Sequence, residues 1–234
     1  RWSSANQEKT GHLDLSYGLK KWAFLTSATF SDYGDLTMGS NGPNDYLRKE
    51  YVRSQNGQDE VMTNPDPERQ VYTGYEQLNL MQKIRYRPSD NWELQYGFHY
   101  STTSDVPRYD RLTLYRNGRL RSAEWYYGPQ VWAMNNLQAT HRSGSMLFDQ
   151  VNISLAHQLF EESRHNRDLG KATRYNRYEK VNAYSANLDF EKAMGQQHHL
   201  FYGLEMIYNH VHSSGTDENS STGATIPGPA RYPD

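Results

Sequence analysis

The chain has 234 residues, enough for one or two domains with a sizeable core, and a formal net charge of -2. This balance lacks the basic excess that nucleic-acid binding needs, so we expect no nucleic-acid partner. The sequence has no cysteine, which excludes disulfides, thiolate catalysis and cysteine metal sites. It also has no run of 18 apolar residues that would form a transmembrane helix.

Eight segments alternate apolar and polar residues with the period of two that is typical of a β-strand. In chain order they cover about residues 12–19, 22–33, 71–86, 92–103, 131–139, 151–159, 184–191 and 200–209. The alternation predicts one apolar face, with Leu13, Leu15, Trp92, Leu94, Leu200, Leu204 and Met206. It predicts one polar face, with Glu93, Gln95, His99, Glu205 and Asn209.

The connections between these strands alternate between short and long. The short ones are residues 20–21, 88–91, 142–145 and 193–197, and the long ones are about 34–70, 104–130, 161–179 and 212–234. Outer-membrane barrels have short periplasmic turns and long extracellular loops, and their tilted strands cross the bilayer with about nine to eleven residues. We therefore predict an all-β fold, an antiparallel transmembrane β-barrel in the bacterial outer membrane. A soluble β-sandwich with ligand-binding loops is the alternative fold.

Residues 1–234 are expected to be part of one barrel domain that is incomplete at both ends. An eight-stranded barrel has a narrow lumen filled by side chains, whereas the predicted inner face carries charges such as Lys83, Arg85 and Glu93. Charges packed in so narrow a space need partners. We therefore predict eight consecutive strands of a larger barrel, whose first and eighth strands do not pair with each other.

Three stretches of the sequence resemble TonB-dependent outer-membrane receptors, especially those of the Bacteroidetes type. They are Phe30–Gly39 (FSDYGDLTMG), Asp105–Leu112 (DVPRYDRL) and Glu124–Pro129 (EWYYGP), and the strand Tyr202–Glu205 is also similar. The resemblance covers most of residues 11–211. The stretch 105–112 is most similar to the haem and haemoglobin branch, with the ferric-siderophore receptors close by.

This resemblance implies a plugged barrel of about 22 strands that imports a scarce, usually iron-bearing nutrient with energy delivered through TonB. The implied partners are outer-membrane lipid and lipopolysaccharide, TonB, and an iron-bearing small ligand or haem protein. The plug domain and the TonB-contacting segment are not found in this chain. The Phe-Arg-Ala-Pro and Asn-Pro-Asn-Leu motifs of haem receptors are also absent, and Asn64–Pro67 (NPDP) does not replace them.

Two predicted loops carry the candidate ligand-binding residues. These are Arg108, Tyr109, Arg111, Trp125, Tyr126, Tyr127, Arg164 and His165. Arginine pairs with carboxylates such as haem propionates, aromatic rings stack on flat ligands, and imidazole is the usual axial ligand of haem iron. Two other interpretations stay open: the arginines fold the loops by pairing with loop carboxylates, or those of 164–177 hold lipopolysaccharide phosphate.

No catalytic motif is present: the chain lacks Gly-x-Ser-x-Gly, His-Glu-x-x-His and a P-loop. We therefore predict no enzymatic activity, no resident cofactor and no resident metal, although the transported ligand can carry iron. The alternative function is an outer-membrane protease or lipase, with Asp105, Asp110 and His165 as its rim residues. His210 and His212 share one strand face and are the remaining candidates for metal binding.

Overall fold

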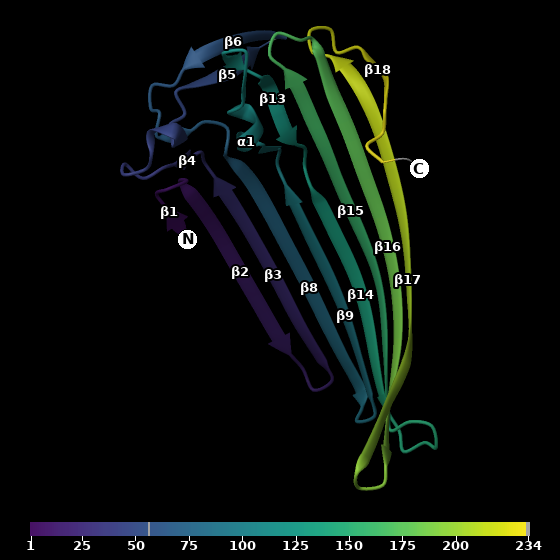
Figure 1. Cartoon of the computed structure of the whole chain (residues 1–234). Helices are drawn as coiled ribbons and strands as arrows, with labels where there is room; N and C mark the ends of the chain where they lie inside the picture. The colour runs from purple at the N-terminus through teal and green to yellow at the C-terminus, as the bar shows by residue number, and fades with distance from the viewer. Residues whose placement is uncertain (56, 233–234) are drawn as a thin grey trace.

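The structure, a computed structural model, describes residues 1–55 and 57–232. One antiparallel sheet of 12 strands runs through the chain (Figure 1). Its eight long strands are β2 (Glu8–Gly18), β3 (Trp22–Tyr33), β8 (Tyr75–Ser89), β9 (Trp92–Thr103), β14 (Val131–Arg142), β15 (Gln150–Asp168), β16 (Thr173–Met194) and β17 (His198–Asn219). They pair in that order as an up-and-down meander. The predicted all-β, antiparallel fold is confirmed.

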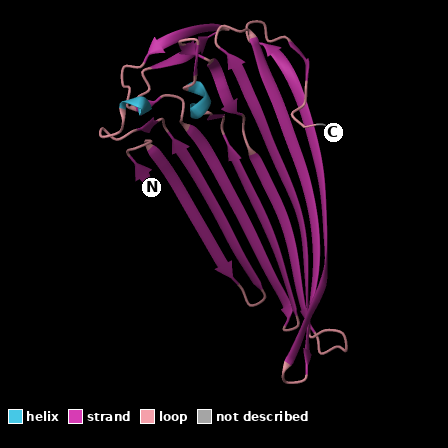
Figure 2. Ribbon diagram, viewed as in Figure 1, coloured by secondary structure: helices cyan, strands magenta, loops and turns pink. Residues whose placement is uncertain are grey.

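The remaining elements are short and gather at the loop end of the sheet (Figure 2). Four of them extend the main sheet: β1 (Trp2–Ser3), β10 (Val106–Pro107), β13 (Ser122–Tyr127) and β18 (Thr225–Gly228). Three separate pairs are formed by β4 (Leu36–Thr37) with β7 (Arg69–Gln70), β5 (Glu50–Gln55) with β6 (Gln58–Thr63), and β11 (Tyr115–Arg116) with β12 (Arg119–Leu120). The helices are the 3-10 turn η1 (Asn44–Tyr46) and α1 (Tyr109–Leu112). Neither is long or apolar enough to span a membrane.

The strand register sorts the side chains into two faces of opposite character. One row of paired residues, apolar throughout, crosses all eight long strands: Tyr17, Phe24, Ile84, Tyr96, Leu137, Leu155, Ala186 and Met206. The next row, on the other face, is mostly polar: Gly18, Ala23, Arg85, Gln95, Gln138, Ser154, Asn187 and Glu205. Because both rows follow from the period of two, the predicted apolar and polar sets each share one face.

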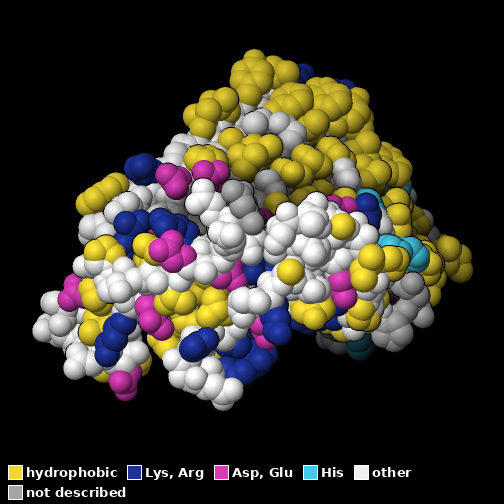
Figure 3. All heavy atoms as spheres, turned by 90° about the horizontal axis from the view of Figure 1, so that it is seen from above, with side chains coloured by type: hydrophobic (Ala, Val, Ile, Leu, Met, Phe, Trp, Pro, Cys, Tyr) yellow, Lys and Arg dark blue, Asp and Glu magenta, His cyan; other side chains and the backbone are white. Residues whose placement is uncertain are grey.

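The polar face is the hollow side of the sheet. A cleft of about 500 Å³ is lined by side chains of this face, among them Lys83, Arg85, Gln95 and His99. The apolar face is uncovered: Leu155 is 46% exposed and Met206 62% exposed. Seen from the loop end, hydrophobic side chains gather along one side of the molecule, and charged side chains are scattered over the rest (Figure 3). A β-sandwich would have a second sheet over the apolar face, and the described residues place none there.

The short connections lie together at one end of the sheet, as predicted (Figure 1). They span residues 19–21, 90–91, 143–149 and 195–197. The predicted long loop 161–179 is wrong, because β15 continues to Asp168, β16 begins at Thr173, and only residues 169–172 connect them. The strict alternation of short and long connections therefore fails here, although the up-and-down order holds.

The predicted segment 212–234 needs a similar correction, because β17 continues to Asn219 and β18 follows it. The physical reason is the same in both places. Strand pairing continues past the apolar band, but the side chains there are polar on both faces, as in Glu161–Arg164. Without apolar alternation, the sequence loses its strand signal while the backbone keeps its hydrogen bonds.

The sheet is open at both edges. No pairing joins β2 to β17 in the described part of the chain, in agreement with the prediction for the first and last long strands. Only the start of β2 is covered, by β1, and only residues 215–218 of β17 are covered, by β18. Most of each edge strand therefore leaves one row of backbone groups without a strand partner.

Candidate ligand-binding site

The candidate site is built where β13 returns from the second long loop and pairs with the upper part of β15. The register places Tyr126 opposite His165 and Tyr127 opposite Arg164. Since neighbouring residues of a strand point to opposite faces, Trp125, Tyr127 and Arg164 lie on the polar face, while Tyr126 and His165 lie on the other. The eight predicted residues therefore do not converge on one site.

Arg108, Trp125, Tyr127 and Arg164 form one group, here called the polar-face cluster. The Arg108 guanidinium lies 5.0 Å from the Trp125 ring centre and 5.7 Å from that of Tyr127. The Arg164 guanidinium lies 5.5 and 5.6 Å from the same two rings. Cations at such distances are attracted by the ring quadrupole. The cluster thus presents two guanidinium groups held by two aromatic rings.

Of the two arginines of the polar-face cluster, one is paired with a carboxylate and the other is not. Arg108 donates two hydrogen bonds to Asp110, of 2.9 and 3.0 Å, and a third to the Tyr127 hydroxyl. Arg164 makes no ion pair with any described residue, and its Nε is enclosed without a hydrogen-bond partner. Arg164 is therefore the group of this cluster that is best placed to receive an acidic ligand.

His165 and Tyr126 form a separate stack on the opposite face. Their ring centres are 4.7 Å apart, and burial raises the pKa of Tyr126 to about 12. His165 Nδ1 is 2.7 Å from Asn176 Oδ1, and Nε2 is 2.9 Å from Ser163 Oγ. Both imidazole nitrogens are already engaged, so haem iron would have to displace one of these bonds.

Tyr109 and Arg111 lie at the margin of the predicted set. The Tyr109 ring faces Arg48, whose guanidinium is 5.3 Å from the ring centre. Arg111 Nε is 3.5 Å from Asp110, the carboxylate that Arg108 already holds. Tyr109 therefore lies outside the polar-face cluster, whereas Arg111 borders it, because Arg111 and Trp125 line the same small cavity.

A network around Arg167 was not found by sequence reasoning. Arg167 is 1% exposed and donates hydrogen bonds to Asp59 (2.6 and 2.9 Å), to Glu124 (2.7 and 2.9 Å), to Ser54 and to the Lys171 carbonyl. Burial would raise the pKa of Asp59, but the bonds from Arg167, the Gly170 amide and Ser54 lower it. The network ties the β5–β6 hairpin to β13 and β15. Arg167 therefore pairs with Asp59 and Glu124, carboxylates of the first and second predicted long loops, as one of the two open interpretations expects.

The catalytic and metal alternatives have no geometric support among the described residues. Asp110 is held by Arg108 and Arg111, and both nitrogens of His165 are engaged by Asn176 and Ser163. His210 and His212 alternate onto the apolar face of β17. No group of three or more His, Cys, Asp or Glu side chains that could hold a metal ion occurs in the part of the chain that the structure describes.

Comparison with known proteins does not assign the chain to a family. No protein-family model matches the chain, and no curated protein matches it either.

Proposed function

We propose that this chain forms a sector of a TonB-dependent receptor barrel in the bacterial outer membrane. The receptor would capture an iron-bearing ligand, such as haem or a ferric siderophore, at the loop end and import it to the periplasm. The observation that carries the proposal is the apolar face that crosses all eight long strands and stays uncovered. Exposing so large an apolar surface to water is unfavourable, whereas its contact with lipid is favourable.

The height of the apolar face suits a membrane. On β17 the apolar residues of this face run from Leu200 to Tyr208 and then give way to His210 and His212. Nine residues at about 3.3 Å each, tilted by about 40°, cover roughly 23 Å, close to the apolar band of ~25 Å in such barrels. This estimate supports a lipid-facing role for the band.

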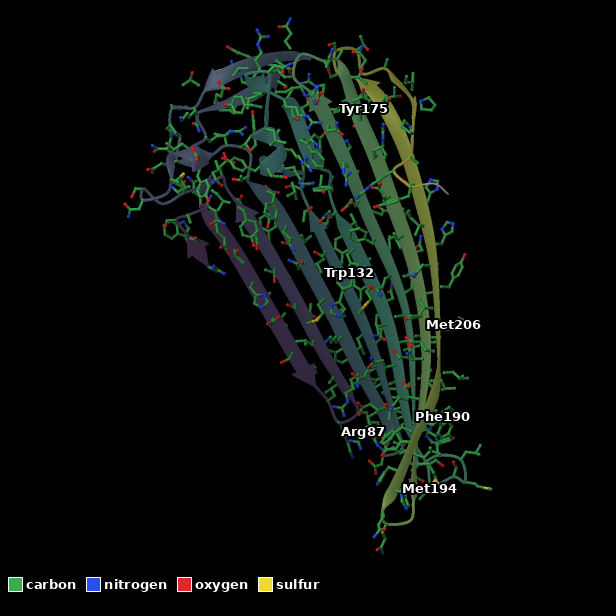
Figure 4. All side chains as sticks on the ribbon, viewed as in Figure 1. Arg87, Trp132, Tyr175, Phe190, Met194 and Met206 are labelled. Atoms are coloured by element: carbon green, nitrogen blue, oxygen red, sulfur yellow. The ribbon has the colours of Figure 1, made fainter. Side chains whose placement is uncertain are left out.

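Aromatic pairs mark the short-turn end of the apolar face. Trp22 stacks on Tyr86 with 4.1 Å between ring centres, and Phe190 stacks on Tyr202 with 4.8 Å. Figure 4 places Phe190 near this end and Tyr175 at the loop end. Aromatic rings collect at the membrane–water interface because they combine apolar faces with polar edges. These aromatic pairs therefore support a membrane–water interface at the level of the short turns.

Several of the polar groups that interrupt the apolar face are paired with one another. The Tyr96 hydroxyl donates to Asn135 Oδ1 at 2.7 Å, and His157 Nε2 lies 3.1 Å from Asn182 Oδ1. In lipid an unpaired polar group costs several kcal/mol, about as much as an unpaired group in a protein core. Pairing within the face is therefore what a lipid-exposed surface requires.

The ligand would meet the polar-face cluster on its way into the barrel. Arg164 would pair with an acidic group of the ligand, and the Trp125 and Tyr127 rings would contact its flat part. Further strands would complete the barrel at the free edges of β2 and β17, and TonB would act through parts of the receptor outside this chain. Lipopolysaccharide would surround the loop end.

The membrane assignment is tested by two neighbouring substitutions on β15 in the full receptor. Leu155→Arg places a charge on the apolar face, and Ser154→Arg places the same charge on the polar face. In lipid the first should cost about 2–4 kcal/mol of unfolding free energy near the bilayer midplane and the second much less. The measurement is urea unfolding in liposomes, with heat-modifiable gel mobility as the folding check.

Equal, small effects of both substitutions would contradict a lipid-facing role. In that case the chain would partition into the aqueous phase of a detergent separation, which is the outcome expected for a soluble binding module. Hydrolysis of peptide or lipid substrates by the purified receptor would support the enzyme alternative.

Ligand capture is tested by Arg164→Gln, with Arg53→Gln as the matched control. Arg53 is an exposed arginine paired with Glu60 on the β5–β6 hairpin. A charge-assisted hydrogen bond contributes about 1.5–3 kcal/mol, so loss of Arg164 should weaken binding about tenfold or more. The measurement is the dissociation constant for haem and for a catecholate ferric siderophore. Unchanged affinity for both would remove Arg164 from the ligand site.

A further inference from the structure

A second cleft lies between the first and second long loops. Its volume is about 530 Å³, within the range of small-molecule sites. The first loop contributes η1 and the residues leading into β5, and the second contributes α1, β11 and β12. Its aromatic and aliphatic lining residues are Tyr46, Leu47, Tyr109, Tyr115 and Leu120.

Arg48 on the wall of this cleft is an enclosed cation that lies over the Tyr109 ring and forms no ion pair with any described residue. It is 4% exposed, and its Nε and Nη1 have no hydrogen-bond partner among the described residues. Burial lowers the pKa of Arg48. A buried charge without an opposite charge is costly, so a group that pairs with it is strongly favoured.

The carboxylates near Arg48 are used elsewhere or exposed. Glu50 accepts a hydrogen bond of 2.9 Å from the Tyr115 hydroxyl, and Asp110 is held by Arg108. Asp45 and Lys49, which also line the cleft, are exposed to solvent. Arg48 makes no ion pair with any of them, so the cleft keeps one buried guanidinium among aromatic walls.

The backbone around Arg48 is held on both sides. Its amide donates to the Pro67 carbonyl at 2.8 Å, and its carbonyl accepts a hydrogen bond of 2.8 Å from Asn64 Nδ2. Asn64 is 4% exposed, and the same amide group also donates to the Arg69 carbonyl. Asn64 thereby fixes the chain so that the Arg48 side chain stays on the cleft wall.

We propose that this cleft binds a small aromatic carboxylate, with its carboxylate on Arg48 and its ring against Tyr109 and Tyr115. A single cation matches the single charge of a carboxylate, and the aromatic walls match a flat apolar body. A phosphate carries more charge and would leave the apolar walls unfilled. The site does not depend on the proposed transport function, because its occupancy is measured without a membrane potential or uptake.

The test is isothermal titration calorimetry of the purified full chain with 2-naphthoate and with its neutral analogue 2-naphthamide. We expect the carboxylate to bind at least tenfold more tightly than the amide. Arg48→Met should abolish this difference, while Lys49→Met, which removes the neighbouring exposed cation, should retain it. Inorganic phosphate should not displace the naphthoate.

Three results would overturn the assignment. Equal affinity of the unsubstituted chain for the carboxylate and the amide would do so, even if Arg48→Met does not fold. A carboxylate preference that survives Arg48→Met would place the recognition elsewhere. Displacement of naphthoate by phosphate, lost in Arg48→Met, would identify a phosphate site instead. Loss of haem or siderophore transport alone would leave the cleft assignment unaffected.

Discussion

Arg167 joins three parts of the chain that are far apart in sequence. It reaches Asp59 on β6, Glu124 on β13 and the carbonyl of Lys171 in the turn after β15. Removing one partner of a buried ion pair leaves an uncompensated charge and costs about 3–5 kcal/mol. We therefore expect Arg167→Met to destabilise the β5–β6 hairpin by this amount, measured by native-state hydrogen exchange of its amides.

Arg53→Met is the control, because the Arg53–Glu60 pair lies on the same hairpin but is solvent-exposed. Exposed pairs contribute about 0–1 kcal/mol. Similar small losses in both variants would show that the Arg167 network does not hold the hairpin. The sequence had no means of indicating this network, because Asp59 and Arg167 are separated by 108 positions. The face of each strand residue, in contrast, depends only on its immediate neighbours and was predicted correctly.

The tight turn between β16 and β17 depends on Gly195, whose φ is +73°. A residue with a Cβ pays roughly 1–2 kcal/mol in this left-handed conformation. Gly195→Ala should therefore lower the unfolding free energy by about that amount, as measured by urea titration. Gly11→Ala is the control, because Gly11 lies in β2 with nothing within 4 Å of an added Cβ. A loss of similar size at Gly11 would contradict the conformational explanation.

Element boundaries were predictable only where the two faces differ in polarity. The strand from Trp92 to Thr103 has the expected bounds, because apolar alternation reaches the turn, whereas β8 begins at Tyr75 and ends at Ser89, four and three residues later than predicted. On β15 the alternation stops at Leu159, but the strand continues for nine more residues, to Asp168. There, pairing with β13 and β16 holds the strand, and such pairing is not written in the local sequence.

The open edges of the sheet determine which backbone amides are protected from hydrogen exchange. Among the described residues, no second strand lies beside the edge amides of β17 between residues 198 and 214, whereas β8 and β9 are paired on both sides. In the isolated 234-residue chain, the outward-facing amides of β17 should exchange much faster than those of β8 and β9. In the full receptor their exchange should slow to the rate of the inner strands. Mass spectrometry of both samples measures this, and fast exchange in both would exclude barrel completion at this edge.

The continuous ladder from Gln150 to Asn166 on β15 has a consequence for how the ligand preference of such a protein can change over evolution. Inserting or deleting one residue within the ladder would turn every following side chain to the opposite face. Arg164 would then leave Trp125 and Tyr127. Connections outside this ladder and outside the Arg167 network, such as the exposed residues 39–43 between β4 and η1, carry no such constraint, so length variation can accumulate there. New specificities are therefore expected to arise by remodelling these segments around a wall of fixed register.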